Sequence, residues 1–174
     1  MCKKVFCLDN NEYGIYKIRD LKNKSKKIDM ILGDVNDYNF IMNFLKTHKV
    51  DVVIHCAAYK HVNILENNLV QAVQNNTIGT YNLCKASLEN NADFLLISTD
   101  KAVEPTSILG YSKRAAENLT RFLSAKNPKK IANIVRFGNV IGSSGSAIPN
   151  FLDQINNNSP ITITHKKASR YFMS

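Results

Sequence analysis

The sequence predicts an α/β protein organised around a doubly wound parallel sheet. Short apolar runs of strand length alternate along the 174 residues with longer segments whose apolar residues recur at helical spacing. Several of these runs end abruptly in polar side chains, as parallel strands do at the carboxyl edge of a buried sheet. Strands that alternate with helices in this way form βαβ units, which place helices on both faces of the sheet.

The expected elements follow one another without a linker, which indicates one domain. Strands are expected over the apolar runs 4–9, 28–32, 50–54, 94–98 and 131–137, with a further β segment over 161–164. Helices are expected over 13–21, 38–48, 65–90, 109–126 and 147–155, the third of them broken near 75–77. Asn10 or Asn11 can cap the first helix. A loop rich in glycine and serine covers 138–145.

The front of the sheet lacks the Gly-rich turn with which a dinucleotide-binding sheet begins. The first glycine, Gly14, lies inside an expected helix, yet Asp9 ends the first strand, where Rossmann-type folds place the acid that binds the adenosine ribose. We therefore expect 1–174 to be a partial Rossmann-type domain that starts at the second strand and is incomplete at both ends. The strands 4–9 and 50–54 would then lose their shared neighbour. We expect either low stability of the chain alone or direct pairing of these two strands.

Composition and charge favour a globular chain without a large binding surface for nucleic acid. The formal net charge is +9, but the lysines are scattered over expected loops and helix exteriors without interleaved aromatic residues. A solvated basic face is the first interpretation, attraction of an anionic nucleotide the second, and nucleic-acid binding is not expected. Four cysteines without metal-ligand spacing indicate free thiols in a reducing compartment. No apolar run approaches the roughly 20 residues of a membrane helix, and no signal peptide is evident, so we expect a cytoplasmic chain.

Two stretches bring proton-handling groups to the same edge of the sheet. The strand 94–98 ends in Thr99, Asp100 and Lys101, and the helix that follows carries Lys113. An acid–base pair that moves protons and an ion pair that caps a loop fit this pattern equally well.

Four motifs, in order along the chain, carry a resemblance to one family. They are His55-Cys56-Ala57-Ala58-Tyr59-Lys60-His61-Val62, Ser98-Thr99-Asp100-Lys101-Ala102-Val103, Arg136-Phe137-Gly138-Asn139-Val140-Ile141-Gly142-Ser143-Ser144-Gly145-Ser146 and Ser169-Arg170-Tyr171-Phe172-Met173. From Asp9 through Met173 the chain resembles the nucleotide-sugar 4,6-dehydratases of the extended short-chain dehydrogenases/reductases, the polysaccharide-biosynthesis proteins that act on UDP-N-acetylglucosamine. It departs from their pattern by lacking the Gly-rich loop, the first strand and the N-terminal membrane helices of long members. It also ends where members of the family continue.

One further departure lies in the site. The superfamily uses Tyr-x-x-x-Lys, but Leu109 stands four residues before Lys113, and Tyr111 lies about 200° round the helix from that lysine. The usual phenolate base is therefore absent, as it similarly is in longer members of this family.

The resemblance implies a reaction in which a hydride leaves C4 of the sugar for NAD⁺, water is eliminated across C5 and C6, and the hydride returns to C6. Asp100 would be the acid for the C6 hydroxyl, which requires a raised pKa, and Lys101 the base at C5. Thr99 would bond the C4 oxygen, and Lys113 would hold the nicotinamide ribose.

The resemblance also implies NAD as the cofactor and a UDP-sugar as the substrate. Asp9 favours NAD over NADP because a carboxylate repels a 2′-phosphate. The expected cofactor contacts are Asp9, Asp34, Val35, Ala57, Ala58, Asn76 and Lys113. The expected substrate contacts, with a substrate-binding region that begins over about 139–174, are Lys60, Asn139, Ser146 and Arg170. We expect the complete protein to be a homo-oligomer.

Two alternatives stay open. A UDP-sugar 4-epimerase of the same superfamily would return the hydride to C4 and needs no acid at C6, so Asp100 and Lys101 favour dehydration. A non-catalytic remnant, or a split subunit that needs its missing half, is favoured by the absent Gly-rich loop.

Overall fold

The computed structural model describes residues 2–143, 145–163, 167, 169 and 171–173 as an alternation of parallel strands and helices. The strands are β1 (Val5–Asp9), β2 (Ile28–Leu32), β3 (Val52–His55), β4 (Asp93–Thr99), β5 (Ala132–Phe137), β6 (Asn139–Val140) and β7 (Phe172–Met173). The α-helices are α1 (Glu12–Lys24), α2 (Tyr38–His48), α3 (Val62–Leu65), α4 (Leu69–Ala72), α5 (Gly79–Glu89), α6 (Ile108–Lys126) and α7 (Ala147–Asn156). A π-helix, η1 (Val73–Ile78), joins α4 to α5, and a 3₁₀ turn, η2 (Asp100–Ala102), follows β4.

The five long strands form two separate parallel sheets, one of β1 and β2 and one in the order β3-β4-β5. Val5 of β1 pairs with Ile28 of β2, and Ser98 of β4 pairs with Arg136 of β5. Within the described residues no ladder joins β1 to β3. Direct pairing of these two strands, one of the two outcomes expected from the sequence, is therefore wrong, whereas the doubly wound parallel architecture is confirmed.

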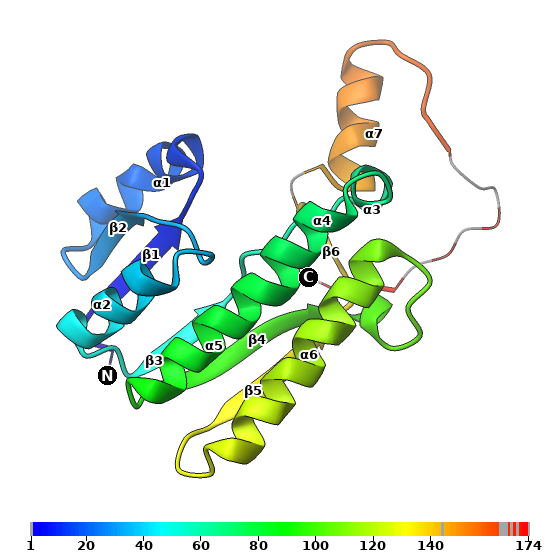
Figure 1. The fold of residues 1–174 in the computed structure, drawn as a ribbon. Coiled ribbons are helices and arrows are strands. Elements are labelled where there is room, and N and C mark those ends of the chain that lie inside the picture. The colour runs from blue at the N-terminus through cyan, green and yellow to red at the C-terminus, as the bar shows by residue number, and fades with distance from the viewer. Residues whose placement is uncertain (1, 144, 164–166, 168, 170, 174) are drawn as a thin grey trace.

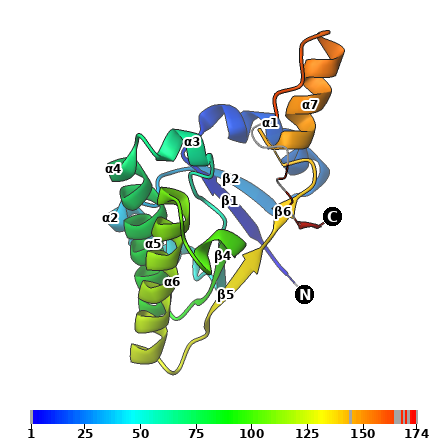
Figure 2. The same cartoon turned by 90° about the vertical axis from the view of Figure 1, so that its right-hand side faces the viewer.

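A layer of three helices covers one face of both sheets. Helices α2, α5 and α6 lie side by side on one face, whereas α1 packs against β1 and β2 on the other (Figures 1 and 2). The main core is formed where this layer meets the strands: Ile41 of α2, Leu83 of α5 and Phe94 of β4 belong to one buried cluster. Leu8 of β1 and Val53 of β3 both pack against that cluster, so the shared helices hold the two sheets together without a ladder between them.

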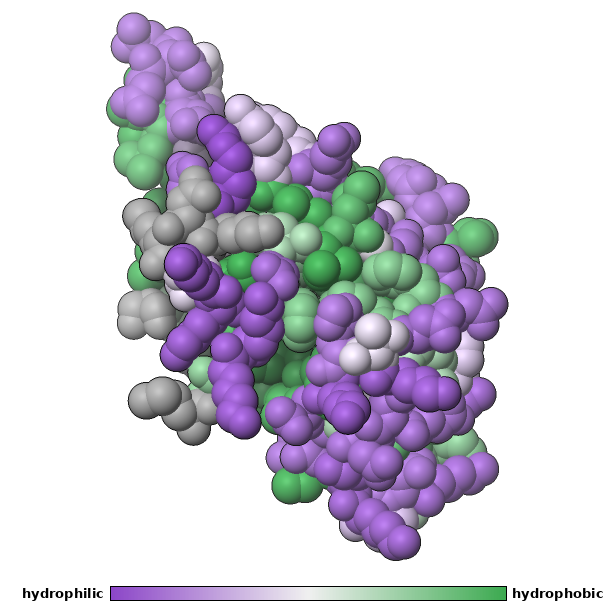
Figure 3. Space-filling model, turned by 90° about the vertical axis from the view of Figure 1, so that its left-hand side faces the viewer, coloured by the Kyte–Doolittle hydropathy of each residue, from purple (hydrophilic) through white to green (hydrophobic). Residues whose placement is uncertain are grey.

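The opposite face is less well covered. Val52 and Ile54 of β3 and Val135 of β5 are exposed. Figure 3 shows apolar residues exposed among hydrophilic ones on the side of the molecule that lies to the left in Figure 1. The α5–α6 side, in contrast, buries alternate residues of β4.

Two local predictions changed form in the structure. The long helical region expected over 65–90 starts as two one-turn helices, α3 and α4, and passes through a π-helix where a break was expected. The β segment expected over 161–164 is not a strand in its described part, 161–163. There the backbone N–H of Thr162 donates to the side-chain oxygen of Gln154, 3.2 Å away, instead of to a neighbouring strand.

Candidate active site

The carboxyl ends of β4 and β5 bring four of the predicted functional residues into one hydrogen-bonded group. The Lys101 ammonium lies 3.0 Å from Asp100 Oδ1 and 3.2 Å from the side-chain oxygen of Asn139, the first residue of β6. The hydroxyl of Thr99 donates to the same Asp100 oxygen at 2.9 Å. The sequence placed Thr99, Asp100 and Lys101 together at the end of one strand, and the fold adds Asn139 to them.

Asp100 does not have the raised pKa that an acid role requires. Its side chain is about half exposed, and partial burial raises the pKa. The hydrogen bonds from Lys101 and Thr99 and the charge of Lys101 outweigh that effect, so that the pKa lies below its usual value. The expectation of a raised pKa is therefore wrong for this chain, where Asp100 is a carboxylate paired with Lys101.

Lys113 lies on the buried face of α6. It is 4% exposed, and its ammonium donates to the carbonyl of Ile97 in β4 at 2.7 Å. Burial lowers the pKa of Lys113 to about 8, although the charges of Glu117 and Cys56 oppose the shift. Tyr111 is exposed on the other side of the helix, so it cannot replace the missing tyrosine, as its spacing predicted.

The strand β3 ends beside Lys113 in a buried histidine. His55 Nε2 lies 2.9 Å from the hydroxyl of Thr80, and burial together with the charge of Lys113 lowers the pKa of His55 to about 3. The imidazole is therefore neutral at pH 7. Ala57 in the loop that follows is exposed, and Ala58 is partly buried, so a small-residue surface adjoins the Lys113 site.

Asn76 positions this loop from the π-helix η1. Its side chain accepts from the backbone N–H of Tyr59 at 2.8 Å and donates to the Tyr59 carbonyl at 3.0 Å and to the Ser112 hydroxyl at 3.2 Å. The side chain is fully buried. These bonds tie the loop after β3 to η1 and α6, so Asn76 shapes the loop that carries Ala57 and Ala58; π-helical turns often occur at functional sites.

A close approach between α6 and η2 depends on Gly110, which sequence reasoning missed. A Cβ atom at this position would lie 2.5 Å from the carbonyl oxygen of Lys101 and 3.1 Å from the Pro105 side chain. Glycine therefore lets the first turn of α6 press against the backbone that carries Lys101. A glycine at the start of a helix, four residues after a proline–threonine pair, was the only signal in the sequence.

The ends of β1 and β2 carry the two predicted acids. Asp9 is exposed, and Asn10 links this end to the next by donating to Asp34 at 3.3 Å. A backbone hydrogen bond from Asn36 lowers the pKa of Asp34 despite partial burial, which keeps it ionised. Val35, expected to contact the adenine, has its side chain buried in the core against Gly79.

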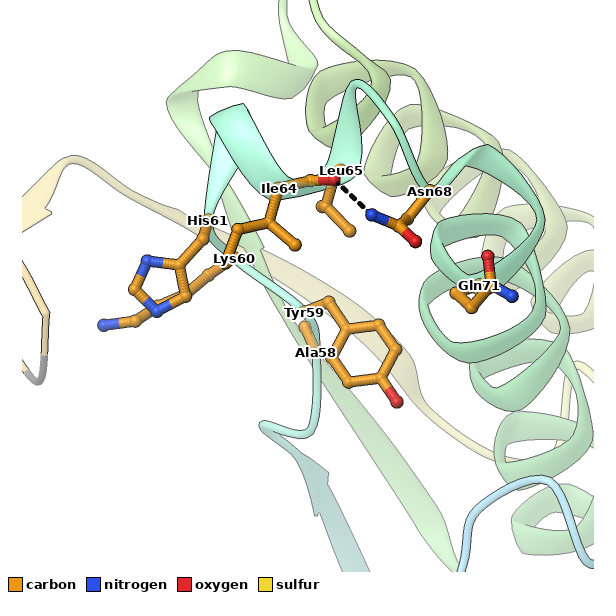
Figure 4. A pocket seen from close by; sticks show the side chains of 8 residues that line it. All are labelled: Ala58, Tyr59, Lys60, His61, Ile64, Leu65, Asn68 and Gln71. Carbon is orange, nitrogen blue, oxygen red and sulfur yellow. Dashed lines mark hydrogen bonds between the residues drawn. The ribbon is translucent and has the colours of Figure 1, made fainter.

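The predicted substrate residue Lys60 lies at a cavity of about 430 Å³ beside α3 and α4 (Figure 4). In that view the Tyr59 ring extends toward the side of Gln71, whereas Lys60 and His61 point the other way. The glycine loop reaches this place from β5, because a Cβ atom on Gly145 would meet the His61 ring at 2.6 Å. Ser146 follows that glycine at the start of α7. Arg170 lies outside the described residues.

Comparison with known protein families places the whole chain in one of them. A family model described as "Polysaccharide biosynthesis protein" matches residues 1–174. The chain belongs to this family of polysaccharide biosynthesis proteins. No helix in the described residues is long and apolar enough to cross a membrane.

Individual relatives of this polysaccharide biosynthesis protein are longer than the chain. The chain is 38% identical over 177 residues to the capsular polysaccharide biosynthesis protein CapD of Staphylococcus aureus. The matched region covers 99% of this chain and 30% of CapD. The chain is also 38% identical over 151 residues to a UDP-glucose 4-epimerase of Rickettsia bellii. That matched region covers 85% of this chain and 44% of the epimerase. The chain thus spans less than half of either relative.

The fold is shared with a solved sugar-nucleotide enzyme. The DesIV dTDP-glucose 4,6-dehydratase of Streptomyces venezuelae, whose structure holds NAD, superposes with a TM-score of 0.89 at 19% identity over 99% of this chain and 59% of that one. This likeness confirms the Rossmann-type fold. The family resemblance inferred from the four motifs is confirmed by the family match.

Proposed function

We propose that this chain supplies the catalytic edge of an NAD-dependent UDP-N-acetylhexosamine 4,6-dehydratase that acts in surface polysaccharide biosynthesis. The observation that carries the proposal is the hydrogen-bonded group of Thr99, Asp100, Lys101 and Asn139 at the end of β4, the strand whose Ile97 carbonyl also binds the buried Lys113 ammonium. An acid, an amine and a hydroxyl are the groups that elimination of water from a sugar requires.

The edge of the sheet fits a nicotinamide dinucleotide. The exposed Asp9 carboxylate suits a ribose diol, Ala57 and Ala58 present small side chains, and the Lys113 amine is held at a fixed position by the Ile97 carbonyl. When bound, the cofactor would accept and return a hydride. The chain's own residues would orient the sugar and move protons at its C5 and C6 positions.

The ion pair explains how Asp100 could act as an acid only when a sugar is present. In the bare chain Lys101 holds the Asp100 carboxylate ionised. A sugar placed between the two side chains would separate the charges and exclude water, and both effects raise the pKa of a carboxyl group. Lys101, in its neutral form, would then take the C5 proton at Nζ, while Asp100 protonates the departing C6 hydroxyl.

A UDP-sugar 4-epimerase is the second candidate, because the chain is 38% identical to the Rickettsia bellii epimerase. An epimerase would use Thr99 and Lys113 in the same way but would need no acid at C6. The two functions therefore differ in their dependence on Asp100.

The test is a titration of the purified chain with NAD⁺, followed by incubation with UDP-N-acetylglucosamine. We expect NAD⁺ to bind more tightly than millimolar and more tightly than NADP⁺, and Asp9→Asn to reduce that preference because it removes the charge that repels the 2′-phosphate. Mass spectrometry then separates the reactions: dehydration lowers the mass of the sugar by one water, whereas epimerisation leaves it unchanged. A product of unchanged mass that persists in Asp100→Asn would establish the epimerase. Absence of NAD⁺ binding at millimolar concentration would overturn both and favour a non-catalytic or split subunit.

A further inference from the structure

Glu117 is a fully buried carboxylate that no step of the proposed reaction uses. It is 0% exposed and stands four residues after Lys113 on α6, so that both side chains lie on the same face of the helix. A buried carboxylate is expensive to maintain unless cations and hydrogen-bond donors surround it.

Glu117 is bonded to both strands that lead into the candidate site. Its Oε1 accepts from the Ser98 hydroxyl at 2.7 Å and from Arg136 Nε at 2.8 Å, and its Oε2 accepts from Arg136 Nη2 at 2.6 Å. Ser98 and Arg136 are register partners in β4 and β5. One carboxylate therefore joins α6, β4 and β5 at a single point, with a bidentate pair to the arginine.

The three elements that meet at Glu117 each deliver a site residue just beyond it. Ser98 is followed directly by Thr99, Asp100 and Lys101 in the chain, and Arg136 precedes Asn139 by three residues. Lys113 lies one helical turn earlier on α6. The distance between the Lys113 amine and the Lys101–Asn139 group thus depends on how the two strands are tied to the helix.

We propose that Glu117 is a positioning residue that fixes the site-bearing ends of β4 and β5 relative to the Lys113 amine. That these ends bind cofactor and sugar rests on the proposed function, whereas the geometric part of the inference does not.

The charge of Glu117 also acts on Lys113. Burial raises the pKa of Glu117. The hydrogen bonds from Arg136 and Ser98 and the charges of Arg136 and Arg121 outweigh this effect, so the pKa lies below its usual value and the group is ionised. The groups that face Lys113 are Glu117 on its own helix, the Cys56 thiol and the neutral His55 from the end of β3. Loss of the Glu117 charge would leave the positive charge of Arg136 unbalanced nearby, and both changes favour the neutral amine.

The test compares Glu117→Gln with Leu123→Ala, a buried apolar truncation at the far end of the same helix. The lysine ¹³Cε chemical shift is followed against pH by NMR, with Lys113 assigned from the Lys113→Arg spectrum. In Glu117→Gln we expect the Lys113 titration midpoint to fall by about one pH unit and the backbone signals of Thr99, Lys101 and Asn139 to shift. Leu123→Ala should lower the stability of the chain but move neither the Lys113 midpoint nor these backbone signals. A packing defect far from the site changes no charge near the amine.

A Lys113 midpoint that is the same in Glu117→Gln as in the parent chain would overturn the inference. If Glu117→Gln does not fold, Arg136→Lys serves as the second variant. It keeps the positive charge at this position but loses the bidentate pair with Glu117. We then expect the backbone signals of Lys101 and Asn139 to shift and those of α2 to stay unchanged. Unmoved Lys101 and Asn139 signals would overturn it equally. Neither readout needs NAD⁺, so failure of the parent chain to bind NAD⁺ would count against the proposed function alone.

Discussion

The unit of β1 and β2 with α1 and the unit of β3, β4 and β5 with α5 and α6 are built from the same alternation of strand and helix, yet their interiors differ. In the second unit, β4 has a strand on each side and buries alternate residues, among them Phe94 and Leu96. In the first unit no residue of β1 or β2 is fully buried. The position of a strand in the sheet, rather than its own sequence, decides how much of it is removed from water.

The difference also separates two kinds of functional residue. Polar side chains are fixed in and beside the second unit: Glu117 and Lys113 of α6, and Asn76 of the adjoining π-helix η1, are buried and hydrogen-bonded. The first unit offers the carboxylates of Asp9 and Asp34 at strand ends with few packing constraints. The chemistry of the candidate site therefore lies in the unit that is most completely packed.

The largest expected effect tests this contrast in packing. Phe94→Ala should lower the free energy of unfolding by about 3–5 kcal/mol, because the ring is 1% exposed and its removal leaves a cavity under α5. Leu32→Ala in β2, where the side chain is 59% exposed, should cost less than about 1 kcal/mol. Urea unfolding of the two variants measures both values. Equal losses would show that the two units are packed alike in solution.

A second test uses the buried charge of the second unit. Lys113→Met should raise the free energy of unfolding at pH 7 by up to roughly 3 kcal/mol, since the folded chain holds the pKa of Lys113 at about 8, against 10.5 in the unfolded chain. Because the unfolded chain binds the proton more tightly, the stability of the parent chain should rise between pH 8 and 10.5. The gain from Lys113→Met should therefore vanish above that window.

The matched control for Lys113→Met replaces an exposed lysine of α2 by methionine. Lys46 is exposed on α2, so the stability of Lys46→Met should stay close to that of the parent chain, and rise with it, over the same pH range. Thermal unfolding as a function of pH checks both variants. A parent chain whose stability does not rise between pH 8 and 10.5 would contradict burial of a charged Lys113.

The smallest expected effect compares the N-terminal caps of two helices, α2 and α6. Asp37 caps α2 by accepting from the N–H of Phe40 at 2.9 Å, and Ser107 caps α6 by accepting from the N–H of Gly110 at 3.2 Å. Replacement of either residue by alanine should cost about 1 kcal/mol. Only Ser107→Ala should change the amide signal of Lys101, because Gly110 lies against the Lys101 carbonyl. Two-dimensional NMR of both variants would show this, and an identical Lys101 signal in Ser107→Ala would contradict it.

Local patterns in the sequence predicted most of the elements and the orientation of several residues. The helical spacing placed Tyr111 on a different side of α6 from Lys113, which the structure confirms, and the break expected near Asn76 is the π-helix. These features depend only on the side-chain period of the element in which each residue stands. The prediction of a raised pKa for Asp100 failed because it required the positions of Lys101 and Thr99 around the carboxylate, which no local pattern contains.

The sequence by itself determined which segments are strands or helices and which residues stand at the carboxyl ends of the strands, because hydrophobic period and capping act over a few residues. Only the tertiary structure decided that no ladder joins β1 to β3 within the described part of the chain, that Val35 is buried against Gly79, and that Glu117 binds Arg136 and Ser98. Those outcomes depend on which elements pack together across long stretches of chain, and each is set by the shape and charge of partners that lie far away in the sequence.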